Sequence, residues 1–202
     1  VDRWDRRDLK AEESPADAPG RFQLAQLWIA LPGNECHREP DFRHYPVLPV
    51  LDRGGFRITV LAGAFGGERS PARVYSPLVG LDLASTGSAR TELPLDPAFE
   101  YAATALEGAP AVDGEALMPG TLLYLGAERS ALTLASTAAS RLLLIGGEPF
   151  GEDILLWWNF VARTREEMEA ATRDWNEGRR FGKVQGARAA PLVAPDIGTL
   201  RL

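Results

Sequence analysis

The chain has 202 residues, of which 45% are hydrophobic and 25% charged, a composition typical of a globular protein with one full core. Its net charge of −6 argues against a nucleic-acid backbone as a partner, because neutralising phosphates requires clustered Lys and Arg. The single cysteine, Cys36, excludes an intrachain disulfide.

The N-terminal stretch predicts a protein that stays in a reducing compartment. It is highly charged and lacks the apolar core of a signal peptide. No apolar run reaches the roughly 18 residues that a membrane span needs. We therefore expect a soluble, cytoplasmic protein that does not contact a membrane.

Two segments precede the regular part of the chain. Residues 1–21 are charged and rich in Pro and Ala, which predicts a loose N-terminal arm. Residues 22–55 are predicted to hold one inter-domain strand, Phe22–Leu31, followed by a polar loop after the turn signal Pro32-Gly33.

From Phe56 the pattern indicates a β-sandwich. Short apolar runs recur at intervals of roughly 8–12 residues between Gly- and Pro-rich turns, as in sandwiches and jelly rolls. The predicted strands are Phe56–Ala62, Val74–Ala84, Arg90–Leu95, Phe99–Leu106, Thr121–Leu125, Ala131–Leu134 and Arg141–Ile145. We place this domain at 56–185 and predict an extended tail over 186–202.

One helix is predicted near the C-terminal end of the domain. Thr164 and Glu167 have the spacing of a capping box. Met168, Ala171 and Trp175 then fall on one apolar face, and Gly178 is suited to a left-handed cap.

Residues that could perform chemistry are few. The two histidines, His37 and His44, lie seven positions apart in a polar loop, a spacing that fits neither H-x-H nor a helical pair. Cys36 beside His37 would point the other way in an extended loop. The glycines of Gly63–Gly67 lack the register of a phosphate-binding loop and predict a hairpin turn. The residues alone therefore indicate no catalytic, cofactor-binding or metal site.

Two motifs nevertheless resemble a known family. The segment QLWIALP at Gln26–Pro32 and the segment Ile154–Gly182, which contains the predicted helix, are similar to the QLW-x-x-LP strand and the terminal segment of pirins. Pirins are two-domain cupins. The resemblance implies an all-β, cupin-type jelly-roll β-sandwich with one C-terminal α-helix, here corresponding to the C-terminal cupin.

The resemblance also implies where the metal of the family lies. Pirins hold Fe(II) or another divalent metal in the N-terminal cupin, which is largely absent upstream of Gln26. The segment Lys10–Pro15 resembles the last element of that site, H-S-E-R-S-P, which would place Glu12 on the carboxylate ligand. Lys10 stands where the histidine belongs and offers no free electron pair near neutral pH.

Three functions follow as alternatives. The first, which we favour for this chain, is a metal-free structural or partner-binding domain, whose partner is another protein, an N-terminal cupin or a second copy. The second is part of a pirin-like, metal-dependent quercetin 2,3-dioxygenase whose metal-binding cupin is not in this chain, which leaves open whether the chain belongs to an enzyme. The third is a small-ligand site in the cupin cavity, lined by Glu100, Tyr101 and Tyr124.

Aromatic side chains are the candidates for an interface. Trp157 and Trp158 are adjacent, so strand alternation would direct one inward and the other outward. Trp28 lies in the strand that joins the two domains of a pirin. We predict these three tryptophans as interface residues.

Overall fold

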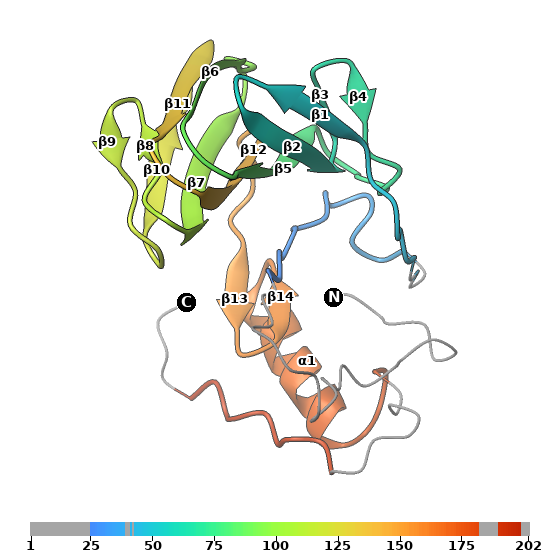
Figure 1. Ribbon diagram of the computed structural model, residues 1–202. Helices are drawn as coiled ribbons and strands as arrows, with labels where there is room; N and C mark the ends of the chain where they lie inside the picture. Colours follow the sequence, from blue (N-terminus) through green and yellow to red (C-terminus); the bar gives the residue numbers. More distant parts are fainter. Residues whose placement is uncertain (1–24, 39–40, 42, 182–189, 199–202) are drawn as a thin grey trace. The chain divides into compact units, whose positions relative to one another are not determined.

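The computed structural model describes residues 25–38, 41, 43–181 and 190–198 (Figure 1). Contacts divide the chain into two units, His44–Phe150 and a second unit formed by Val1–Arg43 together with Gly151–Leu202. Each unit is described by itself. Among the described residues, no helix has both the length and the apolar character needed to cross a membrane.

The unit His44–Phe150 consists of two antiparallel sheets and a small hairpin. The six-stranded sheet has the order β1 (Val50–Arg53), β2 (Phe56–Ala62), β5 (Leu78–Ser85), β12 (Ser140–Gly147), β7 (Glu100–Glu107), β10 (Leu122–Gly126). The four-stranded sheet has the order β6 (Ala89–Pro94), β11 (Ala131–Ser136), β8 (Ala111–Val112), β9 (Glu115–Ala116), and the hairpin pairs β3 (Ala64–Phe65) with β4 (Glu68–Arg69).

Strand alternation builds the core of this unit. In β2, Phe56, Ile58 and Val60 are fully buried, and Arg57 between the first two is exposed. In β6, Leu93 faces inward between two exposed neighbours. Period-two alternation buries one face of each sheet, so the two apolar faces meet in one core. The prediction of a jelly-roll sandwich is confirmed.

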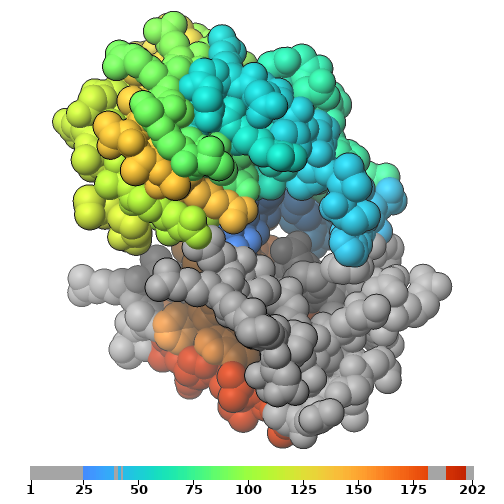
Figure 2. Space-filling view, in the orientation of Figure 1, coloured from blue at the N-terminus to red at the C-terminus, as the bar shows by residue number. Residues whose placement is uncertain are grey.

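Neighbouring strands come from distant parts of the sequence. The central strand β12 pairs with β5 on one side and β7 on the other. The mixture of cyan, green and orange side chains on the face of this unit in Figure 2 shows the same interleaving at its surface. Such non-local pairing is typical of jelly rolls.

The second unit contains a hairpin, the helix and part of the tail. Strands β13 (Leu155–Trp157) and β14 (Phe160–Ala162) are joined by the turn Trp158-Asn159, and helix α1 spans Arg165–Asn176. Met168 and Ala171 are fully buried against the hairpin and against Ala194 and Ile197 of the tail. The predicted apolar face of the helix is confirmed.

Both predicted ends of the helix are confirmed. The backbone N–H of Glu167 donates to the Thr164 hydroxyl over 3.2 Å, while the Glu167 carboxylate accepts from the Arg163 N–H over 2.9 Å. At the other end, Gly178 has a φ of +66° and its N–H donates to the Trp175 carbonyl. This left-handed residue after the cap closes the last turn.

Two segments that precede Phe56 differ from the sequence prediction. The described part of the predicted strand Phe22–Leu31, residues 25–31, pairs with no described strand, because an apolar run forms a strand only where a sheet edge accepts it. Val50–Arg53, expected in a loop, pairs with β2 instead.

Candidate functional site

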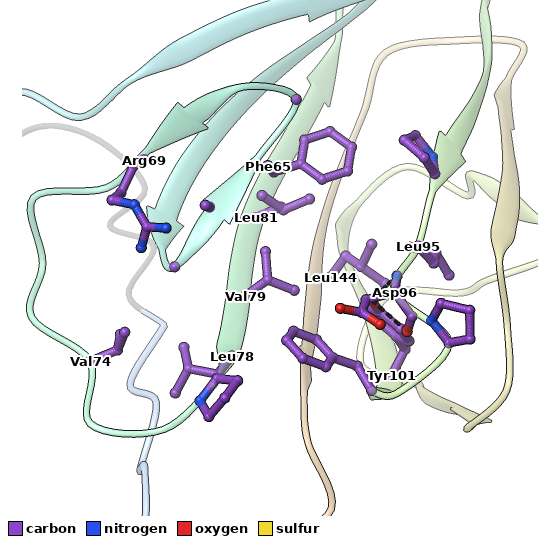
Figure 3. Close-up of a pocket in the computed structure, with 17 residues that line it drawn as sticks. Phe65, Arg69, Val74, Leu78, Val79, Leu81, Leu95, Asp96, Tyr101 and Leu144 are labelled. Atoms are coloured by element: carbon purple, nitrogen blue, oxygen red, sulfur yellow. Dashed lines mark hydrogen bonds between the residues drawn. The ribbon is translucent and has the colours of Figure 1, made fainter.

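A cavity of about 650 Å³ opens inside the unit His44–Phe150 (Figure 3). Its walls come from the β3–β4 hairpin, the first half of β5 and the turn between β6 and β7. Side chains from these separate elements line one space in Figure 3. Val79, Leu81, Leu144 and Tyr101 come from neighbouring strands of the six-stranded sheet, and Phe65 comes from the hairpin. A volume of this size is in the range of small-molecule sites.

The first wall depends on a close approach of two backbones. Gly63, with a φ of +71°, is buried before β3, and a Cβ at this position would lie against the Leu78 carbonyl at far under 3.0 Å. Only glycine fits such a position without strain. The Ser70 hydroxyl then donates to the Leu61 carbonyl over 2.8 Å, which closes the hairpin onto β2.

The opposite wall is fixed by Tyr101 and the turn that precedes it. The Asp96 N–H donates to the Tyr101 hydroxyl over 2.8 Å, and that hydroxyl donates to the Asp96 carbonyl over 3.4 Å. Burial raises the pKa of the Tyr101 hydroxyl. The Asp96 carboxylate accepts from the Ala98 N–H over 3.0 Å, and the ring of Phe99 lies 6.0 Å from that of Tyr101. The turn is therefore rigid and holds the Asp96 side chain at the cavity.

The donor set of the cavity does not fit a cupin metal. Among the residues that the structure describes, its lining includes one carboxylate, Asp96, and no imidazole or thiol. A metal of this fold would need several neutral nitrogen ligands or a cluster of carboxylates. No group of three or more His, Cys, Asp or Glu residues is placed to bind a metal within the described part of the chain. The lining suits a small organic molecule with an apolar body.

The metal-related candidates that the structure describes do not come together at this cavity. Glu12 lies outside the described residues. His37 belongs to the second unit and His44 to the sandwich unit, and both are exposed. The Cys36 thiol donates to the Gly33 carbonyl over 3.1 Å. Of the described candidates, neither histidine nor Cys36 lines the cavity.

The three predicted interface tryptophans all belong to the second unit. Trp28 is 47% exposed, beside the similarly exposed Leu27 and Ile29. Trp157 is half-buried, and its indole N–H donates to the Pro195 carbonyl over 3.4 Å. Trp158 is half-buried and lies among aromatic rings of its own unit. Trp28 is thus the most accessible of the three.

Of the three residues predicted to line a cupin cavity, only Tyr101 does so. Tyr124 is 63% exposed on β10, and its hydrogen bond to the Glu100 carboxylate raises the pKa of the Tyr124 hydroxyl. Sequence reasoning did not single out Arg69 or Asp96 as lining residues. The available signal was their position in turns and hairpins at strand ends, where binding residues often lie.

Two antiparallel sheets with jelly-roll pairing around a cavity define a protein of the cupin class. The family model of the pirin C-terminal cupin domain matches residues 80–182. A Pseudomonas aeruginosa protein, provisionally named a quercetin 2,3-dioxygenase, is 44% identical over 86% of this chain and 55% of its own length. The chain belongs to the pirin family, as its motifs predicted.

Other relatives agree with this assignment. A crystal structure of quercetin 2,3-dioxygenase from Acinetobacter baumannii is 40% identical with a TM-score of 0.83, covering 87% of this chain and 59% of that one. A pirin-like protein of Caulobacter vibrioides is 32% identical over 79% of this chain and 56% of its own length. The chain thus spans a little over half the length of these relatives.

Proposed function

We propose that this chain contributes the C-terminal cupin of a pirin-like, metal-dependent quercetin 2,3-dioxygenase whose metal-binding cupin is not in this chain. The similarity to the Acinetobacter baumannii enzyme carries the proposal, because 40% identity extends over 87% of the chain. The metal, Fe(II) or another divalent ion, would supply the oxygen chemistry from the N-terminal cupin. Glu12 is the residue of this chain that the resemblance to the family's metal segment would make a ligand.

The composition of this cavity supports different roles for the two cupins, with the metal chemistry in the N-terminal one. The described residues that line it include neither the imidazoles nor the carboxylate cluster that a metal requires. We therefore derive no step of the oxygen chemistry from this cavity. The chain would instead provide a rigid sandwich on which the metal-binding domain packs.

The experiment compares the 202-residue chain with a fusion that places the N-terminal cupin of the Pseudomonas aeruginosa relative before Gln26. Both proteins are loaded with Fe(II), desalted, analysed for metal and assayed by loss of the flavonol absorbance band of quercetin. We expect metal and turnover in the fusion only. A correctly folded, metal-loaded fusion without turnover would contradict the dioxygenase assignment. Metal held by the chain alone would direct attention to Glu12, His37 and His44.

A second candidate function is a metal-free domain that binds a protein partner. The observation in its favour is the exposed apolar run Leu27–Ile29, each residue more than two-fifths accessible. Contiguous apolar surface of this kind is typical of interaction sites. An N-terminal cupin or a second copy of the chain would cover it.

Light scattering of the purified chain, alone and mixed with the separately expressed N-terminal cupin, tests this candidate. Association should weaken in Trp28→Ser and persist in Val47→Ser, which removes an apolar side chain that is 80% exposed elsewhere. A monomer that binds no N-terminal cupin would rule the candidate out.

A further inference from the structure

The cavity of the sandwich unit combines apolar walls with two charged side chains. Phe65, Val79, Leu81 and Leu144 supply the walls, which include aromatic and branched side chains. Arg69 enters from β4 and Asp96 from the turn between β6 and β7 (Figure 3). Sites for small molecules have this composition, in which an apolar lining surrounds a few polar groups that orient the ligand.

Arg69 provides the positive charge of the site. No hydrogen bond or ion pair joins its guanidinium to another residue in the part of the chain that the structure describes. By contrast, Arg129 is paired with Asp113 over 2.7 Å and Arg141 with Asp82 over 2.6 Å. A guanidinium presents a planar set of donors that matches a carboxylate. Arg69 is therefore available to an anionic group at the cavity.

Asp96 provides an acceptor at the same cavity. One carboxylate oxygen accepts from Ala98, and the backbone of Asp96 is bound on both sides by the Tyr101 hydroxyl. No bond is described for the second carboxylate oxygen within ranges 25–38 and 43–181. An ionised carboxylate only accepts hydrogen bonds, so it would favour a hydroxyl of the ligand and repel a second acid group.

We propose that this cavity binds a small aromatic carboxylate that carries a hydroxyl group. The aromatic body lies between the rings of Phe65 and Phe99 and the aliphatic walls, the carboxylate pairs with Arg69, and the hydroxyl donates to Asp96. Ring contacts favour an aromatic body over an aliphatic chain. The proposed binding mode needs no metal.

Hydroxynaphthoic acid is a suitable probe, and its carboxamide is the matched neutral ligand. Both are titrated into the 202-residue chain by isothermal calorimetry. We expect the acid to bind about tenfold more tightly than the amide, because a charge-assisted hydrogen bond at a partly exposed site contributes this much. Arg69→Gln should abolish the difference. Arg57→Gln, which removes an exposed arginine that does not line the cavity, should retain it.

Filling the cavity locates the binding. Val79→Phe adds a ring to a buried wall of the cavity and should abolish binding of both probes. Thermal melting shows whether this variant folds. If it does not, Val74→Trp, at a half-buried position that lines the cavity, replaces it. Naphthoic acid without the hydroxyl should bind several-fold more weakly than the hydroxylated acid. Equal binding of acid and amide, a preference that survives Arg69→Gln, or binding that survives a folded cavity-filling variant would each overturn the proposal.

Discussion

The side chain of Asn176 binds both backbone groups of Ala194. Its amide nitrogen donates to the Ala194 carbonyl over 3.0 Å, and its amide oxygen accepts from the Ala194 N–H over 2.8 Å. Beside it, the indole of Trp175 donates to the Leu192 carbonyl over 2.7 Å. The last residues of α1 thus hold the tail as an extended segment, and Ala194 is buried.

Asn176→Ala should release the tail from the helix. The substitution removes two hydrogen bonds from a partly exposed site, which corresponds to about 1–2 kcal/mol of unfolding free energy. Limited proteolysis should then cleave the tail after residue 190 faster than in the parent chain. Arg173→Ala, an exposed change one turn earlier, should leave the cleavage rate unchanged. Equal cleavage in both variants would mean that the buried Ala194 and Ile197 hold the tail without Asn176.

Gly146→Ala should destabilise the sandwich unit and disturb the cavity wall. A Cβ on Gly146 would clash with the ring of Tyr101, and it would lie 2.9 Å from the Glu100 carbonyl. Overpacking of this kind costs about 1–3 kcal/mol. Gly87→Ala is the matched control, because a Cβ there meets no atom within 4 Å, and its effect should stay within about 0.5 kcal/mol. Urea denaturation measures both, and similar stabilities would contradict the packing around Tyr101.

The sequence predicts those features that depend on neighbouring residues. The alternation Phe56–Ile58–Val60 defines one buried face of β2, and the spacing of Thr164 and Glu167 defines the start of the helix. Both patterns reflect local geometry. Side chains of a strand alternate with a period of two, and the glutamate of a capping box reaches back to the backbone at the start of its helix.

The cavity was not predictable in the same way. Arg69 and Asp96 line the same cavity only because the β3–β4 hairpin and the turn after β6 adjoin it, and no local pattern encodes this arrangement. The run Ala25–Leu31 is the reverse case, in which a local pattern predicts a strand that does not form. It has the composition of a strand but pairs with no described strand.

Glu167 should make stability depend on pH. Hydrogen bonds from the backbone N–H of Arg163, then of Thr164, lower the pKa of its carboxyl, helped by the nearby charges of His37 and Arg163. A lowered pKa in the folded state means that the stabilisation is complete above the ordinary glutamate pKa of about 4.3 and is lost as the pH falls through the lowered value.

The matched variants are Glu167→Gln and Glu166→Gln, which alter the same helical turn. Glu167→Gln should be less stable than the parent near neutral pH by roughly 0.5 kcal/mol, because the site is exposed and solvent screens the charge. This difference should shrink in acid, whereas Glu166→Gln should follow the parent curve. Urea denaturation from acid to neutral pH measures the free energy of unfolding of each variant. A difference between Glu167→Gln and the parent that grows in acid would contradict the lowered pKa of Glu167.

Trp158 combines an unfavourable backbone with favourable packing. Its φ of +51° lies in the left-handed region, which favours glycine. Its ring lies 5.4 Å from that of Phe160 and 5.5 Å from that of Trp175. Removing a half-buried indole should cost about 2 kcal/mol or more, so both Trp158→Gly and Trp158→Ala should destabilise the chain.

The relative stability of the two Trp158 variants tests whether the backbone at this position has a positive φ. Glycine relieves the left-handed strain and alanine does not, so Trp158→Gly should be more stable than Trp158→Ala by about 1 kcal/mol. Leu156, 60% exposed in β13, provides the control, since alanine there should exceed glycine in stability by roughly 0.5–1 kcal/mol. Denaturant melts of the four variants give both differences. If alanine were the more stable at both positions, Trp158 would not adopt a positive φ in solution, and packing alone would determine its place in the turn.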